Sequence, residues 1–220
     1  TSIDEVQIDA HITCGGSSAA EARERLEGTL LKIERDTSGM LSVYPVFPGA
    51  SRNNDGARIS IRLPDAYGAE LTTGNGRVVA KGLSGTLIID TSNGRIIVNN
   101  HQGDAKLDTS NGSVEVRDHS GPLEVHTSNG KVTVTLLPDC VGPIHLRSSN
   151  GRLRAEVGSS FAGRVDFDTS NGRVTVTGGD DVITRERLHR TSGYVIFGDD
   201  DGPRSVMDTS NGSIEFIVKD

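Results

Sequence analysis

The most constraining feature of this sequence is a turn motif that recurs at a nearly constant spacing. Asp90–Val98 reads DTSNGRIIV, and Asp108–Val116 reads DTSNGSVEV eighteen residues later. The glycine that closes the motif recurs at intervals of 18, 18, 18, 21, 21, 21 and 19 residues. Self-similarity at such a period is typical of repeat architectures. These glycines are Gly76, Gly94, Gly112, Gly130, Gly151, Gly172, Gly193 and Gly212.

A second glycine marks the opposite side of each repeat. It always precedes the next turn glycine by nine residues, so the three-residue insertions fall in the other half of the repeat. Each repeat is therefore a structural unit with one constrained side and one loop side. The second glycines are Gly85, Gly103, Gly121, Gly142 and Gly163.

Apolar residues alternate with polar ones on both sides of each turn. Leu87 and Ile89 precede one turn, and Ile96 and Val98 follow it. Alternation rich in β-branched residues predicts half-buried strands, so each repeat is expected to hold two short strands and two bends. Aromatic residues make up only 4% of the chain and Trp is absent. We therefore expect a thin core of Val, Leu and Ile.

The turns admit two ways of joining the strands. Asn-Gly between alternating strands is a strong hairpin signal, which favours a meander or barrel. A hairpin, however, makes no demand that Thr and Ser precede the Asn each time. In stacked coils, equivalent residues lie about 4.8 Å apart, so identical Asn or Thr side chains can form a hydrogen-bonded ladder. Gly would supply the positive φ of a sharp corner.

We therefore favour an all-β fold, a β-solenoid of 18–21-residue coils. Its predicted structural turn residues are the Asn-Gly pairs of the motif. They are Asn75, Gly76, Asn93, Gly94, Asn111, Gly112, Asn129, Gly130, Asn150, Gly151, Asn171, Gly172, Asn211 and Gly212.

The residues from Arg58 to Val98 also carry a resemblance. The run RISIRLPDAYGAELTTGNGRVVAKGLSGTLIIDTSNGRIIV resembles the bacterial DUF4097 family of adhesin-like proteins, in which a strand ending in Leu-Pro precedes recurring Thr-Ser-Asn-Gly turns. The resemblance extends to the C-terminus and implies a right-handed β-solenoid in the bacterial cell envelope, outside the cytoplasm. The shortened turn Thr191–Gly193 departs from the pattern and predicts one distorted coil.

Residues 1–69 lack the period that residues 70–220 show. A strand is expected around Val6–Ile12, a short helix over 17–27 with Ser17 or Ser18 as N-cap, and further strands over 30–34 and 41–46. Because the end coils of such a stack expose unpaired backbone, we expect this segment to begin the stack and cap it. The C-terminal SIEFIVKD has no evident cap.

Charge and composition restrict the partners. A net charge of −7 argues against nucleic acid and anionic membranes, and no apolar run approaches the roughly 18 residues of a membrane span. The chain begins at Thr1 without Met, which is compatible with removal of a signal or anchor. Cys14 and Cys140 make no disulfide framework and are expected to be unpaired. The expected partner is an envelope protein, a glycan or a second copy of the chain.

Aligning the repeats places two histidines and a cysteine at equivalent bend positions. Imidazole and thiolate groups on adjacent coils could bind Zn or Cu. The equivalent positions also hold Leu83 and Phe161, which favours a tolerant bend. We therefore predict no metal and no cofactor. If a metal were bound, its candidate ligands would be His101, His119 and Cys140.

Two further sets of equivalent positions, one on each side of the turn, form columns along the aligned repeats. Both contain residues of mixed charge and are expected to be solvent-exposed, with ion pairs that contribute little. One contains the Asp of the motif. The other follows the turn glycine and runs Arg95, Ser113, Lys131, Arg152, Arg173, Tyr194 and Ser213.

No catalytic signature stands out, and so short a coil leaves an interior filled by its own side chains. We expect a non-catalytic, adhesin-like scaffold or binding module. The alternatives are self-assembly into a dimer or filament through the ends of the stack and, more remotely, a polysaccharide-active enzyme with clustered carboxylates.

Overall fold

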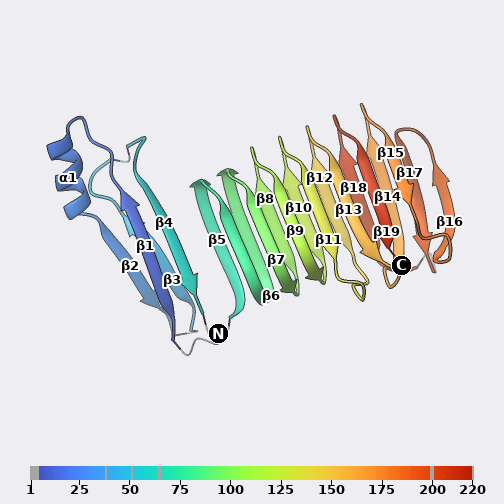
Figure 1. The fold of residues 1–220 in the computed structure, drawn as a ribbon, viewed down its shortest axis with the longest axis horizontal. Coiled ribbons are helices and arrows are strands. Elements are labelled where there is room, and N and C mark those ends of the chain that lie inside the picture. The colour runs from blue at the N-terminus through green and yellow to red at the C-terminus, as the bar shows by residue number, and fades with distance from the viewer. Residues whose placement is uncertain (1–4, 38, 51, 64–65, 199–200, 220) are drawn as a thin grey trace. The chain divides into compact units, whose positions relative to one another are not determined.

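The computed structural model describes residues 5–37, 39–50, 52–63, 66–198 and 201–219 (Figure 1). The chain divides into two compact units, Thr1–Asp65 and Ala66–Asp220. Strands dominate both units, and a single helix is present in the described ranges, so the fold is all-β in class. No helix among these residues is long and apolar enough to cross a membrane.

The first unit contains two antiparallel strand pairs and the helix. Strand β1 (Gln7–Thr13) pairs with β4 (Gly56–Arg62), and β2 (Leu30–Arg35) pairs with β3 (Leu41–Val46). Helix α1 spans Ala19–Glu27, with the Ser18 hydroxyl accepting the Glu21 N–H as an N-cap. Arg25 forms a 2.6 Å ion pair with Asp55. That this segment caps the repeat stack stays a prediction.

The second unit is one fifteen-stranded sheet. Every repeat contributes strands to it, and β6 is long enough to belong to two of its arms. The strands are β5 (Tyr67–Asn75), β6 (Val78–Asn93), β7 (Ile96–Gln102), β8 (Ala105–Thr109), β9 (Val114–Ser120), β10 (Leu123–Thr127), β11 (Val132–Leu136), β12 (Ile144–Ser148), β13 (Leu153–Gly158), β14 (Gly163–Thr169), β15 (Val174–Thr177), β16 (Ile183–Leu188), β17 (Ser192–Phe197), β18 (Arg204–Thr209) and β19 (Ile214–Lys219).

Equivalent strands of the repeats pair in parallel. Asp90 on β6 lies opposite Asp108 on β8, which lies opposite His126 on β10. These strands form a first arm with the order β6-β8-β10-β12-β18-β14, and the second arm has the order β6-β7-β9-β11-β13-β19-β15. A hairpin meander would pair consecutive strands antiparallel. The pairing therefore follows the stacked coils expected from the repeat and excludes the meander in this region.

The core lies between the two arms. The inward positions of both arms are buried Val, Leu and Ile, as expected from the composition. An aromatic cluster stands at one end of this thin core. Phe216 packs against Phe161, Phe167 and Phe197, with ring centroids 5.9, 5.5 and 6.0 Å away.

The last coil does not end the stack, which corrects the expectation of an uncapped C-terminal coil. Strand β18 pairs with both β12 and β14, and β19 pairs with both β13 and β15. The C-terminal coil is thus inserted between two coils that precede it in the chain, as the red strands in Figure 1 show. Its Phe216 fills the aromatic cluster, which gives this position an apolar contact that a stack end would lack.

Strands β16 and β17 stand at the end of the first arm instead. Strands β16 and β17 form an antiparallel hairpin, and β17 pairs antiparallel with β14. The turn Thr191–Gly193 therefore belongs to a hairpin, where the sequence predicted a distorted coil. Val182, Ile183 and Leu188 of this segment pack against the core. The C-terminal coil is therefore not the end through which chains could assemble, and self-assembly through the ends of the stack, one of which is now formed by β15 and β16, stays a prediction.

Candidate functional surface

The predicted turn asparagines form a continuous ladder along one corner of the stack. Each Asn Nδ2 donates to the Oδ1 of the Asn on the neighbouring coil, and all six hydrogen bonds measure 2.9 Å. All seven side chains are exposed. In spatial order the ladder is Asn75, Asn93, Asn111, Asn129, Asn150, Asn211 and Asn171, which again places the C-terminal coil inside the stack.

The threonine of the motif binds the same corner from inside. The buried Thr127 hydroxyl donates to the Gly112 carbonyl of the neighbouring coil at 3.2 Å, and Thr109 donates to Gly94 at 3.3 Å. Thr169, Thr209 and Ser148 make the equivalent bonds. The motif repeats because its Thr and Asn both bond the neighbouring copy.

The turn glycines serve a purpose that the sequence did not reveal. Positive φ was the expected reason, but between Gly94 and Gly212 the glycine of each TSNG turn lies outside that region. A Cβ built on Gly112 would fall far inside 3.0 Å from the Gly94 carbonyl oxygen, a separation that real Cβ atoms essentially never show. Close stacking of coil on coil therefore requires glycine here.

Positive φ is required at the other corner. Gly103 and Gly121 have φ values of 125° and 126°, and the remaining second glycines, Gly85, Gly142 and Gly163, lie between 82° and 88°. Asn100 and Asp118, each at φ 53°, precede this corner on successive coils. Asn and Asp tolerate that conformation better than other side chains. Backbone conformation therefore explains the glycines at this corner, whereas close stacking explains those at the TSNG corner.

The histidines proposed as metal candidates are a buried, stacked pair. The rings of His101 and His119 lie 5.2 Å apart with an interplanar angle of 3°, and their Nδ1 atoms are 3.2 Å apart. His119 Nε2 lies 3.1 Å from the Gly121 carbonyl, so it donates there and its Nδ1 accepts from His101. In that tautomer His101 Nε2 is an acceptor, and among the residues that the structure describes it has no hydrogen-bond partner.

Burial keeps this pair neutral. Desolvation, followed by the nearby His101, lowers the pKa of His119 from 6.5 to about 4. Desolvation also lowers the pKa of His101, against the opposing charge of Asp104.

Cys140, the third metal candidate, has a separate contact. Its buried Sγ accepts the Gly121 N–H at 3.4 Å. Within the part of the chain that the structure describes, no three His, Cys, Asp or Glu side chains are grouped to hold a metal ion. Cys14 and Cys140 are both free thiols, as expected.

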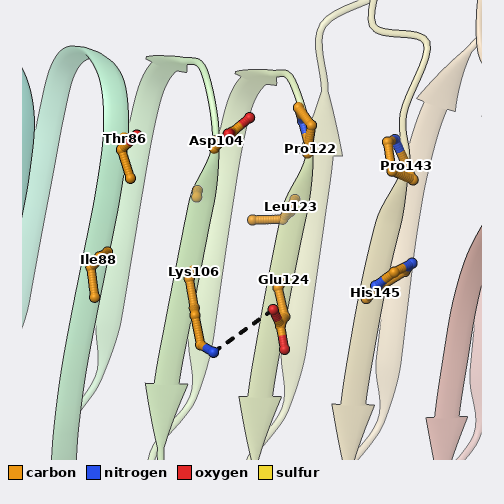
Figure 2. Close-up of a pocket in the computed structure, with 10 residues that line it drawn as sticks. Thr86, Ile88, Asp104, Lys106, Pro122, Leu123, Glu124, Pro143 and His145 are labelled. Carbon is orange, nitrogen blue, oxygen red and sulfur yellow. Dashed lines mark ion pairs between the residues drawn. The ribbon is translucent and has the colours of Figure 1, made fainter.

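The first arm carries a shallow hollow of about 340 Å³ on its outer face (Figure 2). Lys106 and Glu124 point toward each other across its floor from adjacent strands, 3.9 Å apart and each 55% exposed. The rim and floor combine apolar and polar groups. They are Thr86, Ile88, Asp104, Ala105, Lys106, Pro122, Leu123, Glu124, Pro143 and His145.

The second arm presents paired charges on its outer face. Arg154 forms ion pairs with Glu156 at 2.6 Å and with Glu215 at 2.7 Å. Lys219 also pairs with Glu156, and Arg117 pairs with a carboxylate of its own strand, Glu115. The side-chain hydrogen bond from Lys219, followed by that from Arg154, lowers the pKa of Glu156. The charges on this face therefore neutralise one another.

No family model matches this chain, so the DUF4097 resemblance is not confirmed. No curated protein matches either. Among solved structures, it is similar to a protein from Clostridium sporogenes named "putative cell adhesion protein", with 10% identity and a TM-score of 0.33 over 98% of this chain and 100% of the other. A likeness at that level carries no argument about function.

Proposed function

We propose that this chain is a non-catalytic, adhesin-like binding module of a bacterial cell envelope, built as a right-handed β-solenoid. The observation that carries the proposal is the division between inner and outer positions. The inner positions of the stacked coils are filled by buried apolar side chains. The outer faces differ from coil to coil, and together with the exposed corners they are the surfaces open to a partner.

The hollow on the first arm is the proposed contact surface for envelope material. It crosses four adjacent strands, β6, β8, β10 and β12, and is shallow. Ile88 is 39% exposed at one side of it. A surface of this form suits an extended chain lying across strands better than a small molecule, which needs an enclosed site.

Cosedimentation with purified, insoluble peptidoglycan sacculi tests this proposal. The full chain is expected to pellet with the sacculi, and Ile88→Asp is expected to reduce the bound fraction because it places a charge in the hollow. Val79→Asp is the matched control, since Val79 lies on the same strand, is 45% exposed and faces outward on the other arm. Equal losses in both variants, or no cosedimentation of the parent chain, would refute the hollow as the contact surface.

The non-catalytic part of the proposal has its own readout. Incubation of the chain with sacculi is expected to release no reducing sugar ends. Release above the level of a heat-denatured sample would favour the polysaccharide-active alternative.

A further inference from the structure

A row of unpaired cations runs along the corner beside the asparagine ladder. The residues that follow the turn glycines, with Arg190 added at one end of the row, are held next to one another by backbone hydrogen bonds of 2.8–3.0 Å. Ile96 N–H, for example, donates to the Ser113 carbonyl, and Val174 N–H donates to the Arg190 carbonyl. In spatial order the row is Arg77, Arg95, Ser113, Lys131, Arg152, Ser213, Arg173 and Arg190. We name this row the basic ridge.

The order within the basic ridge exists only in the folded chain. Insertion of the C-terminal coil places Ser213 between Arg152 and Arg173. Tyr194 leaves the row, because antiparallel β17 pairs it with Asp166 instead. The result is two cations, a serine, two cations, a serine and two cations. Three coils at about 4.8 Å each give a repeat of about 14 Å between the cation pairs.

The basic ridge lacks the neutralising carboxylates of the neighbouring face. All six of its cations are exposed, and in the described ranges none of them forms an ion pair. Arg95 and Arg152 donate through Nε to the hydroxyls of Ser113 and Ser213, at 2.9 and 3.1 Å. Those bonds fix the two guanidinium groups and leave their other N–H groups free. Six like charges in a row favour an anionic partner.

The asparagine ladder adds a second kind of contact beside the cations. Each amide within the ladder spends one N–H and one acceptor site on its neighbours. The remaining N–H and lone pair of each exposed amide face solvent and suit the hydroxyl groups of a sugar. On the far side of the ladder Asp90, Asp108, Asp208 and Asp168 form part of the next column and would repel an anion. His126 and Arg147 interrupt this column at its middle, so its carboxylates repel an anion near the two ends of the stack.

We infer that the basic ridge binds a linear acidic polysaccharide lying parallel to the stack. The paired cations bind its acidic groups and the ladder amides bind its hydroxyl groups. The ridge has no aromatic side chain on which nucleic-acid bases could stack, so the observations favour an acidic glycan over single-stranded nucleic acid. This inference names a class of ligand and places it at a corner of the stack that is separate from the hollow. It shares with the proposed function only the premise that the chain binds envelope material.

Titration of the full chain with polygalacturonate, a linear polyuronate, tests the inference. The double variant Lys131→Gln/Arg152→Gln removes the central cation pair and is expected to weaken binding by about tenfold or more. The matched control Arg117→Gln/Arg185→Gln removes the same charge from exposed residues outside the ridge and is expected to change the affinity by less than about twofold. Neutral dextran is expected not to bind.

Three outcomes would overturn the inference. Equal weakening in the two double variants would mean that net charge, rather than the ridge, governs binding. Tighter binding of single-stranded DNA than of polygalacturonate would identify a different class of ligand. If polygalacturonate does not bind, the ridge is not a site for acidic glycans, even if the chain cosediments with sacculi. If the chain binds polygalacturonate but not sacculi, the proposed contact surface in the hollow fails and the ridge inference stands.

Discussion

The stacking role of the turn glycines makes a sharp prediction for Gly112→Ala. The new Cβ would also fall 2.7 Å from the Gly94 carbonyl carbon and 3.0 Å from Thr109 Oγ1, so the two coils must separate locally. Such overpacking costs about 1–3 kcal/mol. Separation would also strain the two bonds that join these coils, from Asn111 to Asn93 and from Thr109 to the Gly94 carbonyl, each worth about 1 kcal/mol.

The expected loss is therefore about 3–5 kcal/mol in the free energy of unfolding. In a unit of this size that corresponds to a fall of about 10 °C in Tm, measured by circular dichroism. Gly74→Ala is the matched control, because a Cβ there meets nothing within 4 Å.

A third variant separates stacking from backbone conformation. Asn accepts positive φ, so Gly112→Asn would keep most of the stability if the corner needed positive φ. Under the stacking account it must be as damaging as Gly112→Ala. A Tm of either Gly112 variant equal to that of Gly74→Ala would refute the reasoning.

Three further predictions follow from the same geometry. The pKa of His119 is about 4 in the folded chain and 6.5 in the reference state, so the unfolded chain takes up a proton at higher pH than the folded chain does. The free energy of unfolding should therefore fall by about 3 kcal/mol as the pH drops from 6.5 to 4. Urea titrations at several pH values measure this slope, and His119→Gln should flatten it. Asn111→Ala removes two ladder bonds and should cost about 1–2 kcal/mol, against about half of that for Asn75→Ala at the ladder end, measured by chemical denaturation. Removal of residues 204–220 takes away both parallel partners of the coil 163–177, so limited proteolysis should cut 163–197 far faster than in the full chain; unchanged cleavage would contradict the inserted position.

The candidate surfaces were only partly visible in the sequence. His101 and His119 could be found because they occupy equivalent positions eighteen residues apart, and coils of one period stack such positions. Leu83 and Phe161 at the equivalent position were the sign of burial, which the interpretation as a tolerant bend missed. The basic ridge was hidden because its order follows the order of the coils in space rather than along the chain.

The sequence by itself determined the period, the two strands of each repeat, the inward and outward positions and the asparagine ladder. Each of these depends on contacts between equivalent residues, and alternation and recurrence record such contacts directly. The tertiary structure decided which coil lies beside which. Every complete TSNG turn offers the same Asn, Thr and Gly contacts, so the motif fits any neighbour and does not specify one. Packing of Phe216 among Phe161, Phe167 and Phe197 distinguishes the inserted position, and that contact joins side chains far apart in the chain.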